Sequence, residues 1–415
     1  MLKKIIFALS FLIINTNVYS QDDLEILEPS YIKSVTLHAK KINAFTPIIR
    51  LGERIIFSFD DTEGDEKGYS YKLTHCDADW EKSNISSTEF LDGFNEDTIR
   101  NYENSFNTYQ NYTHYELEIP NRNIRIKISG NYIISVLDSY GDVLFTRRFI
   151  VYQQKVDVGV SVHKARKVED IKTKQNVEIL INYPNIKINN PSEEIAVAIY
   201  QNNDWNNVIT GVKPQYFRGS QLIYKYGNET TFNGSNEYLY FDTKDYRSST
   251  NSIRRVELKD LYETRLYVNE TRKSRAYTYN PDINGNFFIR SINAENTKLE
   301  GDYTKVHFIY KNYTALNKGE SIYVYGAFNN WQFTDENELT LTNNGYFETD
   351  ILLKQGFYNY TFVKLDADYN IDNTLEGTHY QTENDYSVFV YYKRFGSRYD
   401  EVIGYGIGNS VNLKN

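Results

Sequence analysis

The fold class is decided by the stretch YIISVLDSYGDVLFTRRFIV, residues 132–151. Two runs rich in β-branched and aromatic residues, 132–137 and 143–151, flank the link Asp138-Ser139-Tyr140-Gly141-Asp142. Such runs favour strands, and a short link of Asp, Ser and Gly favours a tight turn. The stretch therefore predicts a β-hairpin, and we expect it to complete a first sandwich that ends at residue 153.

Alternation of apolar and polar residues recurs on the N-terminal side of this hairpin, as in 115–119 and 124–128. Because successive strand side chains point to opposite faces, each such run predicts a strand with one buried face. No heptads or long helical stripes are present. Tyrosine, with 38 residues, dominates an aromatic content of 15%. The sequence therefore predicts an all-β protein.

Short strands separated by turn signals predict three immunoglobulin-like β-sandwich domains in series. We expect an N-terminal sandwich at 21–153, a middle sandwich at 154–298 and a C-terminal sandwich at 299–415. The strands expected in the middle sandwich include 195–200, 238–241 and 287–289, and those expected in the C-terminal one are 303–308, 322–325, 346–353, 358–363 and 388–392. The segment 86–112 lacks clean alternation, and a loop of that length is usually functional or partly helical.

The first twenty residues have the pattern of a cleavable secretory signal. Lys3 and Lys4 precede an apolar core at 5–14, and Val18-Tyr19-Ser20 ends in a small residue. The apolar run is about ten residues long, too short to cross a bilayer of ~30 Å as a helix. We therefore expect a mature chain that begins at Gln21, is soluble or peripheral, and does not insert into the membrane.

The net charge and the cysteine content further limit the classes of protein that fit this sequence. Loss of the two signal lysines takes the formal net charge from −9 to −11. Such a surface repels nucleic-acid phosphates and anionic lipid, so neither is an expected partner. Cys76 is the only cysteine; it cannot form an internal disulfide, and it lies too far downstream to carry an acyl anchor at the new N-terminus. These features predict a bacterial periplasmic or surface protein.

The residue pattern of an enzyme is missing. The six histidines are scattered, with no two at metal-ligand spacing. The densest polar cluster is His75-Cys76-Asp77-Ala78-Asp79-Trp80, which we interpret as a buried cysteine followed by a turn that Asp residues cap. The acidic run 60–66 lacks the ligand spacing of a calcium loop and reads as a hairpin tip. We expect no catalytic residues, no metal and no cofactor.

A candidate binding motif lies near the C-terminus. The run GAFNNW, residues 326–331, followed by GYF at 345–347 and GFYNYTFV at 356–363, resembles the glycogen-binding modules of starch-active enzymes and kinase β-subunits, which are immunoglobulin-like sandwiches. In that family, sugar stacks on the Trp of this turn and on a second Trp, while a Lys bonds hydroxyls. Here Trp331 matches, Thr361 replaces the Lys, and Tyr369 lies near the second position. The resemblance implies the fold, and it makes Trp331 and Tyr369 the candidate carbohydrate-binding residues.

A wider pattern covers nearly the whole mature chain. It consists of YKLTHCDADW (71–80), EFLDGFN (89–95), YENSFNTYQNYTHY (102–115), LEGDY (299–303) and YDEVIGY (399–405). This combination resembles the Plug protein family of the Bacteroidota type IX secretion system. The resemblance implies a non-enzymatic periplasmic protein at the inner face of the outer membrane. Its partner would be the outer-membrane translocon barrel, whose pore it plugs when cargo is absent.

Aromatic residues suit such a role because protein interfaces are enriched in Tyr, Trp and Phe. We place the partner contact in the irregular segment 86–112, at Phe90, Phe94, Tyr102 and Phe106. The alternative is that these residues form the core of a loop folded back on its own sheet. The competing hypothesis for function is a periplasmic or surface carbohydrate-binding protein that uses the C-terminal sandwich.

Overall fold

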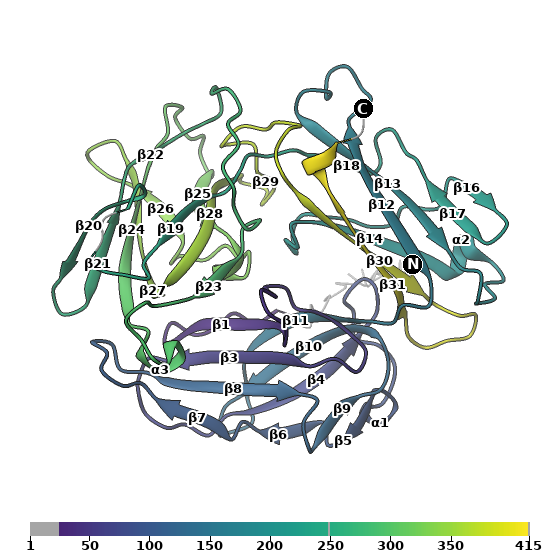
Figure 1. The fold of residues 1–415 in the computed structure, drawn as a ribbon, viewed down its shortest axis with the longest axis horizontal. Coiled ribbons are helices and arrows are strands. Elements are labelled where there is room, and N and C mark those ends of the chain that lie inside the picture. The colour runs from purple at the N-terminus through teal and green to yellow at the C-terminus, as the bar shows by residue number, and fades with distance from the viewer. Residues whose placement is uncertain (1–24, 248–249, 414–415) are drawn as a thin grey trace, which may run out of the picture.

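The computed structural model describes residues 25–247 and 250–413, and the expected signal at 1–20 lies outside these ranges (Figure 1). In the described part of the chain, strands dominate and each α-helix has four residues, so the predicted all-β fold is confirmed. None of the described helices has the length and apolar character needed to cross a bilayer. Figure 1 shows three sandwiches around a common centre, with the N-terminal one at the bottom.

The N-terminal sandwich packs two sheets over an aromatic core. One sheet has the order β1 (Ile32–Ala39), β3 (Ile55–Asp61), β8 (Thr113–Ile119), β7 (Asn101–Asn104). The other sheet has the order β2 (Ile48–Arg50), β11 (Val143–Tyr152), β10 (Gly130–Leu137), β4 (Ser70–Cys76), β6 (Glu96–Thr98). The expected hairpin is present as β10 and β11, with Tyr132 opposite Phe149. Both rings are fully buried and stack on each other in the core.

The segment 86–112 forms several short elements. Helix α1 (Ser87–Phe90) leads into β5 (Leu91–Gly93), which pairs with β9 (Ile124–Ile126), while β6 and β7 extend one edge of each sheet. At the start of α1, the carboxylate of Glu89 accepts a hydrogen bond from the Ser86 amide at 2.9 Å, which satisfies a free helix donor. Alternation is absent because these edge strands have only three or four residues.

The middle sandwich is completed by the last strands of the chain. One sheet has the order β12 (Asp157–Lys164), β13 (Lys174–Asn182), β17 (Gln221–Tyr224), β16 (Tyr216–Arg218), and β18 (Thr231–Asn233) also pairs with β13. The facing sheet has the order β15 (Val208–Ile209), β14 (Ile195–Gln201), β30 (Asp385–Tyr392), β31 (Glu401–Asn409). Helix α2 (Pro191–Glu194) precedes β14. Gly404, Gly406 and Gly408 let β31 approach β12 closely, since an added Cβ at each would meet a valine side chain or carbonyl at 2.4–2.6 Å.

The third sandwich is one large sheet folded over its own core. Its strand order is β19 (Leu239–Asp242), β28 (Gly356–Leu365), β25 (Ser321–Tyr325), β26 (Glu338–Leu341), β27 (Phe347–Lys354), β24 (Tyr303–Lys311), β21 (Tyr262–Leu266), β20 (Ile253–Leu258). Three short strands pair outside this order: β22 (Asn269–Glu270) with β24, and β23 (Phe287–Ile289) and β29 (Ile371–Asp372) with β28. The remaining short elements are α3 (Thr297–Glu300), η1 (Ala327–Asn329) and η2 (Ser410–Asn412). Phe308, Val324 and Tyr360 pack together from the two layers.

Sheet membership crosses the boundary that we expected at residue 298. Strand β30 belongs to the expected C-terminal domain, yet it pairs with β14, with Val390 opposite Val197. Strands β19 and β23 belong to the expected middle domain, yet both pair with β28. The third sandwich, at 239–372, is thus inserted between two segments of the middle one. The expected series of three separate domains differs from the observed strand pairing. Alternation shows which face of a strand is buried, but it does not show which strand lies beside it.

Candidate functional site

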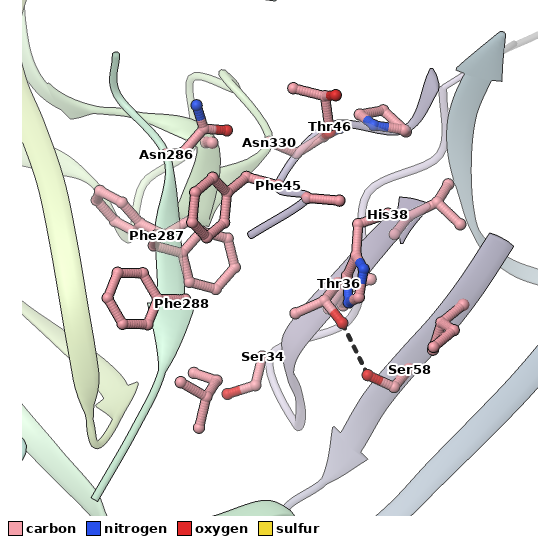
Figure 2. Close-up of a pocket in the computed structure, with 18 of the residues that line it drawn as sticks. Ser34, Thr36, His38, Phe45, Thr46, Ser58, Asn286, Phe287, Phe288 and Asn330 are labelled. Carbon is pink, nitrogen blue, oxygen red and sulfur yellow. Dashed lines mark hydrogen bonds between the residues drawn. The ribbon is translucent and has the colours of Figure 1, made fainter. Parts of the chain in front are cut away.

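The three sandwiches enclose a pocket of about 700 Å³ where they meet. Figure 2 shows a polar wall from β1 and β3 opposite an aromatic wall from β23 and the loop before β2. The polar wall presents Ser34, Thr36, His38 and Ser58, and the aromatic wall presents Phe45, Phe287 and Phe288. A pocket of this size is within the range of ligand sites, which are usually apolar with a few polar groups. This pocket is the candidate functional site.

The aromatic wall is held in place by stacking. The rings of Phe45 and Phe288 stack with centroids 5.6 Å apart, and Phe288 stacks on Phe357 at 5.5 Å. The guanidinium of Arg290 lies 5.0 Å from the centroid of Phe288, a cation–π distance. Phe45 comes from the N-terminal sandwich and the other three residues from the third sandwich. The wall therefore joins two sandwiches and has a fixed shape before any ligand binds.

All three tryptophans of the chain lie at this junction, one from each sandwich. Trp80 and Trp205 meet edge to face with ring centroids 5.4 Å apart, and the indole N–H of Trp80 donates to the Tyr200 hydroxyl at 3.2 Å. Trp331 packs against Tyr325 at 5.2 Å. Because a buried Trp removes 150–250 Å² of surface from water, the three sandwiches share a substantial core and form one body.

Two of these tryptophans have an unusual backbone. Trp80 has a φ of +69° and Trp331 a φ of +60°. Positive φ is rare for bulky residues and costs on the order of 1–3 kcal/mol. The amide of Trp80 donates to the Asp77 carbonyl at 2.9 Å, and that of Trp331 to the Gly326 carbonyl at 3.1 Å. Such strain persists only where the surroundings impose it and is concentrated at functional regions.

A buried ion pair joins the N-terminal and third sandwiches beside the pocket. Lys354 Nζ lies 2.7 Å from Asp60 Oδ2, and both side chains are at most 2% exposed. Asp60 also accepts a hydrogen bond from the Tyr303 hydroxyl at 2.7 Å and contacts His114 Nδ1 at 2.6 Å. Burial favours a neutral Asp60, but Lys354 and His114 outweigh it and hold the pKa of this carboxyl below its ordinary value. Loss of one partner would leave an uncompensated buried charge.

A second buried carboxyl, Asp204, links the middle and third sandwiches. The Tyr325 hydroxyl donates to its two oxygens at 2.9 and 3.0 Å, and the Asn206 amide donates to Oδ1 at 2.9 Å. Burial raises the pKa of Asp204 to about 7, against the lowering effect of these hydrogen bonds. The sequence reveals only a turn here, because an Asn-Asn-Asp run is typical of turns wherever they lie. The burial of Asp204 depends on the third sandwich, which supplies Tyr325.

The structure separates the four expected contact residues into one buried and three exposed. Phe90 is 5% exposed and packs against His75 in the N-terminal core. Phe94, Tyr102 and Phe106 are 74%, 39% and 72% exposed. Figure 1 places the elements that carry or flank Phe94 and Tyr102, β5 to β7, along the lower edge of the N-terminal sandwich, away from the pocket. The amide of Phe94 donates to the Asn123 carbonyl at 3.1 Å, next to β9, whereas that of Phe106 donates to the Leu299 carbonyl at 3.0 Å, in α3. The three exposed rings are therefore separate candidate contact positions.

The two candidate carbohydrate-binding residues differ in exposure. Trp331 is 3% exposed, its ring lies against Tyr325 and Tyr238, and Asn206 donates to its carbonyl at 2.6 Å. Tyr369 is 82% exposed. A sugar stacks on an open ring face, and Trp331 offers none. Its Asn-Asn-Trp turn instead fixes the junction between the middle and third sandwiches.

The cluster around Cys76 is structural. The thiol is fully buried, and burial raises its pKa to about 12. The carboxylate of Asp77 accepts hydrogen bonds from the Ser83 hydroxyl at 2.5 Å and from the Asp400 amide at 3.1 Å. These contacts agree with the interpretation of a buried cysteine followed by a capped turn.

The acidic hairpin tip brings the carboxylates of Asp61, Glu63 and Asp65 close together. The ammonium group of Lys67 pairs with all three. It also lies 4.4 Å from the centroid of the Tyr31 ring. The cluster therefore contains its own counter-ion.

Comparisons with known proteins agree with one of the two resemblances. Residues 32–153 match the family model described as the type 9 secretion system plug protein 1st domain, which confirms the resemblance to the plug family. A crystal structure of a hypothetical protein from Parabacteroides merdae ATCC 43184 superposes with a TM-score of 0.89 at 29% identity, covering 93% of this chain and 98% of that chain. The arrangement of the three sandwiches therefore recurs there.

A second solved structure, trypsin-activated alpha-2-macroglobulin from Escherichia coli, has a TM-score of 0.19 and 8% identity, over 92% of this chain and 24% of that chain. An overlap this poor carries no argument about the fold. No curated protein matches this chain.

Proposed function

We propose that this protein docks on the periplasmic end of the outer-membrane translocon barrel and plugs its pore when cargo is absent. The reason is that residues 32–153 match the plug protein family of the type 9 secretion system. In this role it has no catalytic activity. It lies at the inner face of the outer membrane after removal of residues 1–20 and is held there by its partner. The family match is the observation that carries the proposal.

The junction supports a plugging role because a plug must move as one unit. Domain interfaces allow relative motion unless they are large and apolar. Here a shared core with one tryptophan from each sandwich is reinforced by two buried polar links. These links are Asp60 with Lys354 and Asp204 with Tyr325. A body joined in this way resists deformation when it closes a pore.

We place the docking contacts at the exposed aromatic residues Phe94 and Tyr102, on the outer edge of the N-terminal sandwich, and Phe106, beside α3. Large exposed rings surrounded by polar residues suit an interface, because the centre of an interface is apolar and its rim is polar. The neighbouring strand β6 supplies polar side chains from Glu96, Asp97 and Thr98. Phe90 supports this edge from the core side.

The test is co-purification with the affinity-tagged translocon barrel from cells that produce both proteins. We expect the native chain to be retained with cargo-free barrel, and the double variant Phe94→Glu, Phe106→Glu to be retained at least tenfold less, since interface anchors typically contribute about 2 kcal/mol or more. The matched control is Phe395→Glu, at a ring that is 92% exposed in the middle sandwich; its retention should equal that of the native chain.

Two results would contradict these proposals separately. Consistent absence of the native chain from cargo-free barrel would exclude the plugging function itself. Retention of the double variant at the native level would exclude only the docking contacts. Uptake of a large hydrophilic antibiotic gives an independent measure of pore closure, because cells that lack this protein should admit it faster than cells that produce it.

A further inference from the structure

The polar wall of the junction pocket is the outer face of a sheet. Thr36, Ser58 and Glu116, from β1, β3 and β8, line the pocket. Their sheet neighbours Phe57 and Leu117 belong to the core of the N-terminal sandwich. Because successive strand side chains point to opposite faces, the polar set lies on the face away from that core. The pocket therefore lies between this sheet face and the aromatic wall across from it (Figure 2).

The charged side chains of the lining are paired within the protein. Every lysine and arginine that lines the pocket has a carboxylate partner, and the two lining carboxylates, Asp60 and Glu116, are among these partners. The pairs are Lys41 with Glu53, Arg147 with Glu28, Arg148 with Glu25, Lys298 with Glu116, and Lys354 with Asp60. A charged ligand would have to displace one of these partners or remain without a counter-ion, which is unfavourable. The lining therefore favours an uncharged ligand.

Neutral hydrogen-bond acceptors remain free in the lining. The side-chain nitrogen of Asn286 donates to the Ile283 carbonyl at 2.8 Å, and that of Asn330 donates to the Glu25 carboxylate at 3.0 Å. These bonds orient both amide groups, and each side-chain oxygen is left as an acceptor without a partner among the described residues. Nδ1 of His38 donates to the carbonyl of the next residue at 2.9 Å, so Nε2 of the neutral ring is a third acceptor. All three residues line the pocket.

The lining offers neutral donors as well. The side-chain oxygen of Asn203 accepts from the Ser387 hydroxyl at 2.8 Å, which leaves the amide nitrogen of Asn203 as a donor without a partner in the described part of the chain. Thr36 and Ser58 share one hydrogen bond at 2.8 Å, so one of their two hydroxyl protons stays available. A ligand that meets neutral acceptors and neutral donors needs groups that can play both roles. A hydroxyl group plays both.

The aromatic wall supplies stacking surfaces for the same ligand. Phe45 is half-buried, and its ring stacks on Phe288 through one face. Phe287 is also half-buried and stacks on Tyr358 with centroids 5.5 Å apart. The second face of Phe45 and of Phe287 has no aromatic partner among the described residues. A sugar ring matches this combination, because its C–H groups pack on an aromatic ring while its hydroxyls meet polar groups around the edge.

We infer that the junction pocket binds a short, uncharged oligosaccharide. Its rings pack against Phe45 and Phe287, and its hydroxyls bond to the sheet face and to the free amide groups of Asn286 and Asn330. This site needs no open face on Trp331. The inference does not depend on the proposed docking contacts on β7, because β7 and β1 are the two opposite edges of one sheet.

The probes are three neutral sugars, maltotriose, cellotriose and triacetylchitotriose, and one charged sugar, trigalacturonate, each added to the full mature chain. We expect saturable binding of at least one neutral sugar, followed by the fluorescence of Trp205 and Trp331, which line the pocket. Trigalacturonate should bind about tenfold more weakly, because its carboxylates find no free cation. Hydrogen exchange should slow over residues 34–38 and 285–289. No binding of any neutral sugar at about 10 mM, equal binding of the charged sugar, or protection confined to other segments overturns the inference.

Two variants test the two walls separately. Phe45→Leu keeps an apolar side chain but removes the flat ring, and it should weaken binding about fivefold. Thr36→Val removes a hydroxyl at nearly constant volume, and it should weaken binding about threefold. The matched controls are Phe395→Leu, at an exposed ring of the middle sandwich, and Thr98→Val, at an exposed position of β6; both should bind as the native chain does.

Circular dichroism shows whether each variant is folded. Native-level binding of the neutral sugar by either folded wall variant contradicts the inference. If one variant does not fold, the other decides, and if neither folds, the comparison of neutral with charged sugar on the native chain decides.

Discussion

Asp204 shows how one buried carboxyl makes the junction sensitive to pH. Its folded pKa is about 7, whereas an unfolded aspartate titrates near 3.9. Between these values the folded protein holds a proton that the unfolded chain has released. Linkage then requires the free energy of unfolding to fall as the pH rises through this window. Asp60 has the opposite sign: its lowered pKa contributes stability above the unfolded value, and that stability is lost as the pH falls through the folded pKa.

We expect Asp204→Asn to remove the share of Asp204 in the pH dependence between pH 5 and 8. Asp282, whose pKa burial also raises to about 7, keeps its own share. From Asp204 the native chain should lose at most about 3 kcal/mol of unfolding free energy over that range. Urea denaturation at the two pH values measures the difference, and pH 5 is high enough to leave Asp60 ionised. Asp368→Asn, at an exposed position of the third sandwich, serves as the control. If the variant and the native chain show the same pH dependence, the assignment to Asp204 is wrong.

At the scale of elements, strands were predictable from the sequence and their neighbours were not. The runs 195–200 and 287–289 appear as β14 and β23, because their residue types favour strands in any context. The pairing of β14 with β30 depends on a contact between segments far apart in the chain, and neither run specifies it. The same limit applies at the candidate site. The turn at Trp331 was found from the sequence, but its burial depends on the middle sandwich.

The pairing of β14 with β30 makes a prediction about fragments. We expect the fragment 154–298 to remain unfolded, because β14 then keeps only the two-residue strand β15 as a neighbour. A fragment spanning 154–415 should fold, since it contains both interleaved sandwiches. The matched comparison is 154–384, which differs only by the loss of β30, β31 and the residues that follow. Far-UV circular dichroism with thermal melting measures the outcome, and a cooperative transition in 154–298 or 154–384 would contradict it.

At the scale of the whole molecule, the shared core makes three sandwiches one cooperative body. Sandwiches connected only by linkers unfold independently, whereas here the residues that bury the tryptophans come from all three. The superposition with the Parabacteroides merdae structure, at a TM-score of 0.89, shows that this arrangement is not peculiar to one sequence. The junction is therefore as much a part of the fold as the individual cores.

This cooperativity is measurable because tryptophan fluorescence reports only the junction, while far-UV circular dichroism reports strands everywhere. We expect the two signals to change at the same urea concentration, as in a two-state transition. A red shift of the fluorescence at lower urea than the loss of strand signal would show that the junction opens first. That result would contradict the single-body description and weaken the case for a rigid plug.

The insertion of residues 239–372 into the middle sandwich has a consequence for biogenesis. On the proposed export route, in which the chain emerges from its N-terminus, β12 to β18 reach the periplasm before the strands that complete their sandwich. Their apolar face stays uncovered until the whole inserted sandwich and then β30 and β31 have been translocated, and exposed faces of this kind promote aggregation. Maturation is thus tied to the arrival of the final strands, and a nascent chain that stalls before them should be a substrate for periplasmic chaperones and proteases.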